Sequence, residues 1–212
     1  MSSGPRAARD KPDAPLAAAD LEGLIPTFVA TRADLNIAEQ ANIETATRWA
    51  FGRRLVTTPH ELFTIEFSDI VHRRMFGEVY TWAGRHDVQH LPPGVQPHWI
   101  ERRLRDALND ARRAHDLGIT APSELAVRLQ RRLVKVHAYR DGNARHGRFM
   151  ADLYLHLIGV PRLKWEAAHE PEAIDTQRRS DLTALQTALD KATRDVALRR
   201  SGAPVRPTKT RI

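Results

Sequence analysis

Apolar residues recur at steps of three and four along most of this chain, the spacing of helices that bury one face. The first such run begins at Asn36 and closes at Gly52, and the second opens at Thr58 and ends at Gly77. The full pattern predicts helices over about 36–52, 58–77, 97–116, 123–137, 142–158 and 171–199. An all-α fold class follows from this succession of elements.

Polar residues mark the expected helix ends. Thr58 is expected to cap a helix that has Pro59 in its first turn, and Ser123 is expected to cap another. Within the first two helices the spacing places Ile37 and Ile70 on the buried faces. The sequence therefore predicts both where these helices begin and which sides face the core.

Residues 84–97 break the helical pattern. The segment is rich in Gly and Pro and alternates weakly around Val88 and Leu91. Such a pattern is typical of an extended, hairpin-like loop. We therefore expect a short β-hairpin inserted between two helices.

The domain organisation follows from composition along the chain. Residues 1–19 are rich in Pro and Ala and are expected to form a disordered leader. Residues 20–199 are expected to form one domain, and 200–212 a basic flexible tail. No internal repeat or low-complexity block interrupts this plan.

Composition excludes several classes of function. The chain has no cysteine, which excludes disulfides and a cysteine nucleophile and fits a cytoplasmic location. No apolar run approaches the length of a membrane span, so no membrane association is expected. The net charge of +7 invites a nucleic-acid interpretation, but only five of the 33 basic residues are lysines, and seven of the 33 lie in 191–212. Because an arginine bias can follow base composition, we do not expect nucleic-acid binding.

The richest chemistry lies between two predicted helices, in the segment HAYRDGNARHGR at 137–148. The N-terminus of the second helix offers unpaired N–H groups to an anion, and Gly142 permits close approach of a phosphate. Asn143 adds an amide donor, and Arg145 and Arg148 share one helix face.

A metal ligand and a base complete the predicted site. Asp141 would repel a phosphate unless a Mg²⁺ lay between them. His137 ends the preceding helix and has a side chain that can accept a proton near neutral pH. Each residue alone also has an ordinary explanation, such as a helix cap or a turn. Their order within twelve residues favours a site for a nucleotide and Mg²⁺.

This segment resembles the Fic family signature His-x-Phe-x-[Asp/Glu]-Gly-Asn-Gly-Arg-x-x-Arg, with Tyr139 at the Phe position. The segment VYTWAGRHDV resembles the family's entry into a flap that holds the target, and residues 20–165 resemble the subgroup called mobile mystery protein B. The resemblance implies a Fic-type helical bundle with a flap at about 84–97.

The activity that the resemblance implies is transfer of AMP from ATP to a Ser, Thr or Tyr hydroxyl of a target protein. His137 would be the general base, Asp141 would bind Mg²⁺, and Gly142 and Asn143 would form the anion hole. Arg145 would hold the leaving pyrophosphate and Arg148 the γ-phosphate. Tyr139 would anchor the loop in the core.

Two departures keep alternatives open. Ala144 replaces the family's second Gly, and His86–Asp87 stands where many members have Tyr-Arg. The related Doc toxins also vary at the position of Ala144, bind ATP the other way round and phosphorylate their target. Protein phosphorylation therefore remains an alternative, as does a degenerate Fic protein that acts as a binding or regulatory partner.

Regulation is also implied by the resemblance. Many Fic proteins carry an inhibitory helix whose Glu pairs with the second motif Arg. Glu22, in DLEG, and Glu44, in QANIET, are the candidates in this chain. If neither pairs with Arg148, an antitoxin-like partner can supply the carboxylate. The subgroup is typically encoded on mobile elements beside a helix-turn-helix partner.

Overall fold

The computed structural model describes residues 14–52, 57–89 and 94–165. Seven α-helices and no strands occur in this part of the chain, which confirms the all-α prediction. The helices are α2 (Ala18–Leu21), α3 (Arg32–Ala50), α4 (Pro59–Leu62), α5 (Ile65–Phe76), α6 (Pro97–Leu117), α7 (Pro122–Val136) and α8 (Asn143–Leu157).

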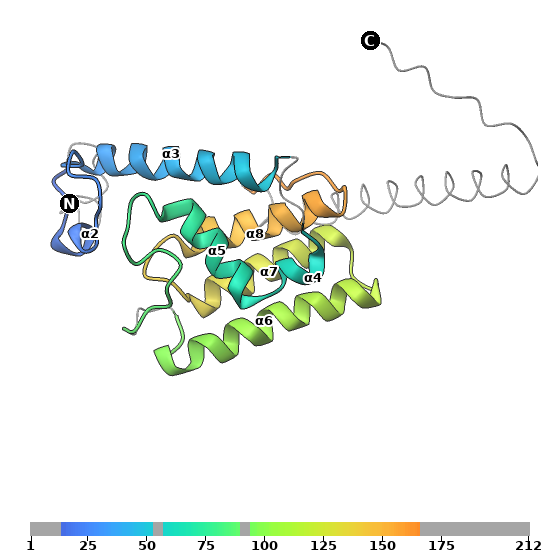
Figure 1. The fold of residues 1–212 in the computed structure, drawn as a ribbon. Coiled ribbons are helices and arrows are strands. Elements are labelled where there is room, and N and C mark those ends of the chain that lie inside the picture. The colour runs from blue at the N-terminus through green and yellow to red at the C-terminus, as the bar shows by residue number, and fades with distance from the viewer. Residues whose placement is uncertain (1–13, 53–56, 90–93, 166–212) are drawn as a thin grey trace, which may run out of the picture.

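Helices α7 and α8 pack against each other along their lengths and form the centre of the domain (Figure 1). Helix α6 packs on α7, α5 packs on α8, and α3 lies along α5. Met150, Ala151 and Leu153 of α8 are fully buried. Burying a side chain of the size of Met150 or Leu153 contributes about 1.5–3 kcal/mol to folding. The loop between α7 and α8 is therefore held by the best-packed pair of helices.

Several boundaries and faces differ from the sequence predictions. The predicted helix at 58–77 is two helices, because Thr64 caps a new helix by accepting a hydrogen bond from the Phe67 N–H at 3.2 Å. Ile37 and Ile70 are 68% and 42% exposed, so their assignment to buried faces was wrong. Ser123 lies buried inside α7 and does not cap it, since Pro122 already opens that helix.

The start of the chain also differs from the prediction. Residues 14–19, expected within the leader, pack against the domain: the Arg32 N–H donates to the Ala14 carbonyl at 3.0 Å, and Leu16 packs against the core. Residues 1–13 and the predicted elements at 171–199 and 200–212 lie outside the described residues.

The flap segment is described at 84–89 and 94–97 and is not helical up to Gln96. No strand ladder occurs in these residues, and 90–93 lie outside the described part, so the hairpin stays a prediction. Among the described helices, none combines the length and apolarity that a membrane span requires.

Candidate functional site

His137 ends α7 in the left-handed conformation, with φ 55° and ψ 55°. It is the only non-glycine residue with positive φ among the described residues. This conformation costs about 1–2 kcal/mol. Its ring atom Nδ1 is buried and has no hydrogen-bond partner in the described part of the chain. Strained backbone and unpaired buried polar atoms both concentrate at functional sites.

Helix α8 begins immediately after Gly142, which has φ 75° and no side chain to cap the helix. The first N–H groups of α8 therefore lack a side-chain cap and remain suited to an anion. The side chain of Asn143 is not available for that purpose. It is buried, donates to the Tyr139 carbonyl at 2.6 Å and accepts from the Tyr139 N–H at 3.0 Å. The side chain of Asn143 therefore closes the loop.

Replacing Gly142 with alanine is expected to damage this loop. A Cβ at Gly142 would lie 2.5 Å from Cε2 and 2.6 Å from Cζ of the Phe76 ring, in addition to the positive φ. We expect a loss of about 1–3 kcal/mol in the free energy of unfolding from the overlap alone. Gly159 is the matched control, because its φ is 73° and nothing lies within 4 Å of its added Cβ. Urea denaturation of Gly142→Ala and Gly159→Ala measures the difference, and equal losses would contradict the predicted clash.

Three predicted residues lie on the outer side of the loop. The Asp141 side chain is 61% exposed, and its Oδ1 accepts the Gly142 N–H at 2.5 Å. Ala144 and Arg148 are exposed, and among the described residues no ion pair joins Arg148 to a carboxylate. Since Ala144 lies in regular helix without positive φ, its backbone does not require glycine.

Arg145 points inward to a carboxylate that the sequence did not reveal. Its Nη1 donates to Oε2 of Glu39 at 2.5 Å, and the Tyr80 hydroxyl donates to Oε1 of Glu39 at 2.8 Å. The Glu39 side chain is 6% exposed, and Arg145 lies over the Phe76 ring at 4.9 Å. Burial alone would lower the pKa of Arg145, but the hydrogen bond to Glu39 and the charges of Glu39 and Asp141 together raise that pKa. Burial, followed by the charge of Glu39, raises the pKa of Tyr80.

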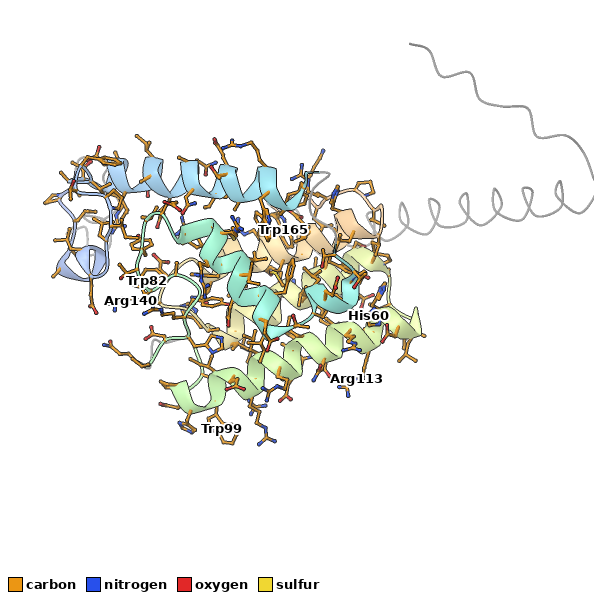
Figure 2. All side chains as sticks on the ribbon, viewed as in Figure 1. His60, Trp82, Trp99, Arg113, Arg140 and Trp165 are labelled. Carbon is orange, nitrogen blue, oxygen red and sulfur yellow. The ribbon has the colours of Figure 1, made fainter. Side chains whose placement is uncertain are left out.

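Glu22 and Glu44 occupy other positions than expected. Glu22 receives two hydrogen bonds from the Arg140 guanidinium, within the signature loop but not at Arg148. Its carbonyl accepts the Trp82 indole N–H at 3.0 Å, and Trp82 and Arg140 lie on the same side of the domain (Figure 2). Glu44 is exposed and accepts a bond from Gln40 of its own helix. Neither carboxylate pairs with Arg148.

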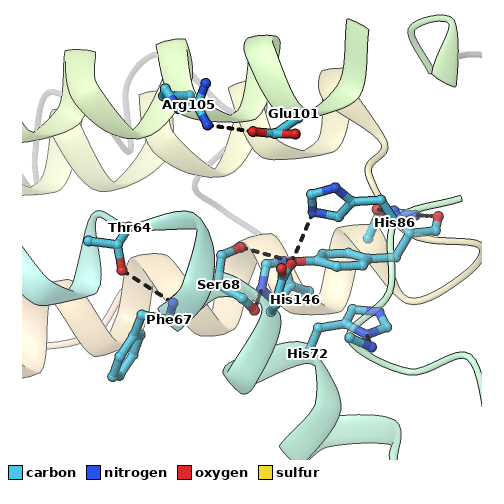
Figure 3. Close-up of polar contacts among 12 residues, drawn as sticks. Thr64, Phe67, Ser68, His72, His86, Glu101, Arg105 and His146 are labelled. Carbon is cyan, nitrogen blue, oxygen red and sulfur yellow. Dashed lines mark hydrogen bonds and ion pairs between the residues drawn. The ribbon is translucent and has the colours of Figure 1, made fainter. Parts of the chain in front are cut away.

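Tyr139 lies in the core beneath the loop and is 1% exposed. Its hydroxyl donates to Oδ1 of Asp69 at 2.8 Å and lies 3.0 Å from Oγ of Ser68. His146 of α8 bonds through Nε2 to the Ser68 carbonyl at 3.1 Å (Figure 3). Burial raises the pKa of Tyr139 well above its usual value and lowers that of His146 to about 4. Both side chains are therefore neutral structural supports.

His72 of α5 is fully buried and joins two loops through its two ring nitrogens. The Gly84 N–H donates to Nδ1 at 3.0 Å, and Nε2 lies 3.0 Å from the Asp141 carbonyl. Because an N–H can only donate, Nδ1 accepts, and the proton resides on Nε2, which donates to Asp141. Burial, then the nearby His146, holds the pKa of His72 well below its usual value.

The two ends of the flap segment are attached on either side of His137. The Asp87 N–H donates to the Ala138 carbonyl at 2.9 Å, and the Val95 N–H donates to the Val136 carbonyl at 3.3 Å. His86 contacts Oδ1 of Asp69 through Nε2 at 3.1 Å. A segment held in this way passes close to the predicted base.

Sequence patterns could have revealed part of what was missed. Glu39 follows Leu35 by four residues and precedes Asn42 by three, so it shares the inward face of α3. A carboxylate on a buried face requires a partner, which was the available signal. No local pattern identifies Arg145 as that partner, since 106 residues separate the two.

Known proteins with similar sequence or fold point to one family. The sequence profile of the Fic/DOC family matches residues 63–155. Protein adenylyltransferase Fic of Nematostella vectensis is 32% identical over 108 residues, which are 48% of this chain and 25% of that protein. The aligned segment therefore spans a quarter of that relative's length.

Solved structures agree in fold. Fic-1 from C. elegans has a TM-score of 0.55 at 20% identity, over 82% of this chain and 56% of that one. BepC of Bartonella tribocorum, with bound AMPPNP, has a TM-score of 0.53 at 14% identity, over 71% of this chain and 88% of that one. The profile match spans the whole signature loop, which the structure places between two packed helices. The chain therefore contains a Fic/DOC family domain.

Proposed function

We propose that the protein transfers AMP from ATP to a Ser, Thr or Tyr hydroxyl of a target protein. The observation that carries the proposal is the junction of α7 and α8, which places a strained His137 and the uncapped N-terminus of α8 at the two ends of one loop. The adenylyltransferase relative supports the same reaction class.

The residues of the loop fit the proposed substrate. The exposed carboxylate of Asp141 and the start of α8 can receive a metal-bound polyphosphate. No cluster of three or more metal-binding side chains occurs among the described residues, so Asp141 would hold Mg²⁺ together with phosphate oxygens and water. When bound, Mg²⁺ neutralises phosphate charge. Gly142 supplies backbone donation, and Arg145 and Arg148 supply guanidinium groups.

His137 is proposed to take the proton of the target hydroxyl as its oxygen forms a bond to the α-phosphorus. The bond from that phosphorus to the bridging oxygen breaks, and pyrophosphate leaves. The flap ends at Asp87 and Val95 bind the backbone on both sides of His137, which supports presentation of a target segment there. Positioning and charge neutralisation account for most catalysis of this kind.

The test identifies which group of ATP is transferred to the target protein. The protein is incubated with lysate and either α-³²P-ATP or γ-³²P-ATP. Label from the α position alone is expected. Label from the γ position alone would establish phosphorylation, the alternative that Ala144 keeps open. Absence of both labels, after release of the inhibition proposed below, would favour a degenerate binding partner.

Substitution of Ala144 by glycine addresses that alternative. Because Ala144 is exposed and regularly helical, Ala144→Gly is expected to retain transfer of the α label while lowering the free energy of unfolding by about 0.5–1 kcal/mol. The ratio of α to γ label measures the outcome. A switch from γ label in the natural chain to α label in the variant would show that the methyl group sets the nucleotide pose.

Glu39 is proposed to restrain the enzyme by holding Arg145 away from phosphate. This assignment replaces Glu22 and Glu44, which do not contact either motif arginine. The same proposal includes a helix-turn-helix or antitoxin-like partner, membership of the mobile mystery protein B subgroup and a cytoplasmic location. An intrinsic Glu39 restraint does not require a partner to supply the carboxylate.

A further inference from the structure

His72 occupies an unusual position for a polar side chain. It is fully buried, yet both ring nitrogens have backbone partners that lie on different loops, at Gly84 and Asp141. Its ring stacks on Tyr139 with centroids 3.8 Å apart and an interplanar angle of 22°, and the Phe76 ring lies 4.9 Å away. Packing therefore prevents the ring from turning and fixes the direction of both hydrogen bonds.

The bond to Asp141 has a consequence for the next residue. The carbonyl of Asp141 and the N–H of Gly142 belong to one planar peptide unit and point in opposite directions. When Nε2 of His72 draws the carbonyl inward, the Gly142 N–H must point outward. In the structure this N–H meets the exposed carboxylate of Asp141 at 2.5 Å. The Gly142 N–H thus already points to a negatively charged acceptor.

We propose that His72 is a positioning residue that aims the Gly142 N–H at the nucleotide's phosphates. The inference rests on the proposed function, because it assumes that this loop receives a polyphosphate. His72 itself need not touch the nucleotide. It acts through one peptide plane, and rigid packing makes the orientation available before the nucleotide binds.

The second bond of His72 connects the phosphate loop to the target side of the site. Gly84 approaches so closely that an added Cβ would lie 2.7 Å from the Asp69 carbonyl oxygen and 2.8 Å from the Cβ of Arg73. Three residues further on, the Asp87 N–H binds Ala138, the residue after His137. One buried ring therefore contacts both the loop that leads into the flap and the loop that receives phosphate.

Two substitutions separate these bonds. The side-chain amide of asparagine reaches the position of Nδ1, and that of glutamine reaches the position of Nε2. His72→Asn can accept from Gly84 but leaves the Asp141 carbonyl without its donor. His72→Gln can donate to Asp141 but leaves the Gly84 N–H without its acceptor. Each variant loses one of the two hydrogen bonds between His72 and the backbone, so comparable losses of melting temperature are expected and make the pair matched.

Calorimetric titration with ATP and Mg²⁺, in the natural chain and in the Glu39→Gln background, provides the first measurement. His72→Asn is expected to weaken ATP binding about tenfold or more, since a hydrogen bond to a charged group is misdirected. His72→Gln is expected to retain most of the affinity, and adenosine, which has no phosphate, should bind all three chains equally. In the transfer assay, His72→Asn should raise KM for ATP more than it lowers kcat. Equal ATP affinities for the Asn and Gln variants would overturn the inference.

The Gly142 amide resonance in ¹H–¹⁵N spectra of the nucleotide-free protein gives an independent measurement. It should move in His72→Asn and stay close to its position in His72→Gln. If the natural chain and the Glu39→Gln chain bind no ATP, the proposed function fails, and this resonance still decides whether His72 orients the peptide. An unchanged Gly142 resonance in both variants would refute that orientation.

Discussion

Replacement of His137 by alanine is expected to lower the rate of label transfer from ATP to protein by a factor of about 10²–10⁴. The imidazole of His137 can accept a proton. The residues on either side of it, Val136 and Ala138, accept backbone hydrogen bonds from the two ends of the flap segment. The backbone strain is unchanged, because alanine at φ 55° is strained as histidine is. Melting temperature should therefore change little.

His156 provides the control for His137. It lies on the same helix as the motif arginines, is exposed and contacts only the edge of Phe51 among the described aromatic rings. His156→Ala should retain labelling. The rate is measured with α-³²P-ATP at saturating nucleotide, so that binding does not limit it. Persistent labelling by His137→Ala at the natural rate would remove His137 from the role of base.

Replacement of Glu39 by glutamine is expected to increase ATP affinity and labelling by about tenfold or more. In the natural chain, nucleotide must displace a charge-assisted bond between Arg145 and a buried carboxylate, which is worth about 1.5–3 kcal/mol. The glutamine amide keeps the shape and can still accept from the Tyr80 hydroxyl. It lacks the charge that holds Arg145, so the guanidinium becomes available to phosphate.

Glu44→Gln is the matched control, because Glu44 is on the same helix and, within the described part of the chain, its carboxylate bonds only to Gln40. It removes the same charge without touching the motif and should leave affinity unchanged. Titration calorimetry with ATP and Mg²⁺ measures both variants. Weaker binding by Glu39→Gln would mean that Glu39 orients Arg145 productively and does not restrain it.

Helices α6 and α7 were predictable from sequence because each has a strongly periodic apolar face. The failures have local causes. A threonine cap at Thr64 divided one apolar run, and Ile37 and Ile70 follow the helical period but lie beside the buried stripe. Periodicity gives the position of a residue around the helix axis only approximately. Residues at the border of the apolar face are therefore easily assigned to the wrong side.

The loop at 137–148 was predictable in kind because its residues are contiguous. Its partners were not, because they come from distant segments. Glu39 and His72 reach the loop through hydrogen bonds that span 106 and 69 residues. Tyr80 holds Glu39 across 41 residues, and no local pattern encodes such pairing. The sequence also suggested that the Asn143 amide binds phosphate, whereas its side chain bonds the backbone of Tyr139. A polar residue in a motif can thus be retained for loop shape.

The carboxylates of Glu22 and Glu39 precede the loop that they contact by about a hundred residues. A ribosome, which adds about 5–20 residues per second, exposes them many seconds before Arg140 and Arg145 are made. The arginines of a nascent chain are therefore made after both of their partner carboxylates. A newly folded molecule would then have Arg145 already bound to Glu39. The first nucleotide that reaches it would have to compete with Glu39 for Arg145.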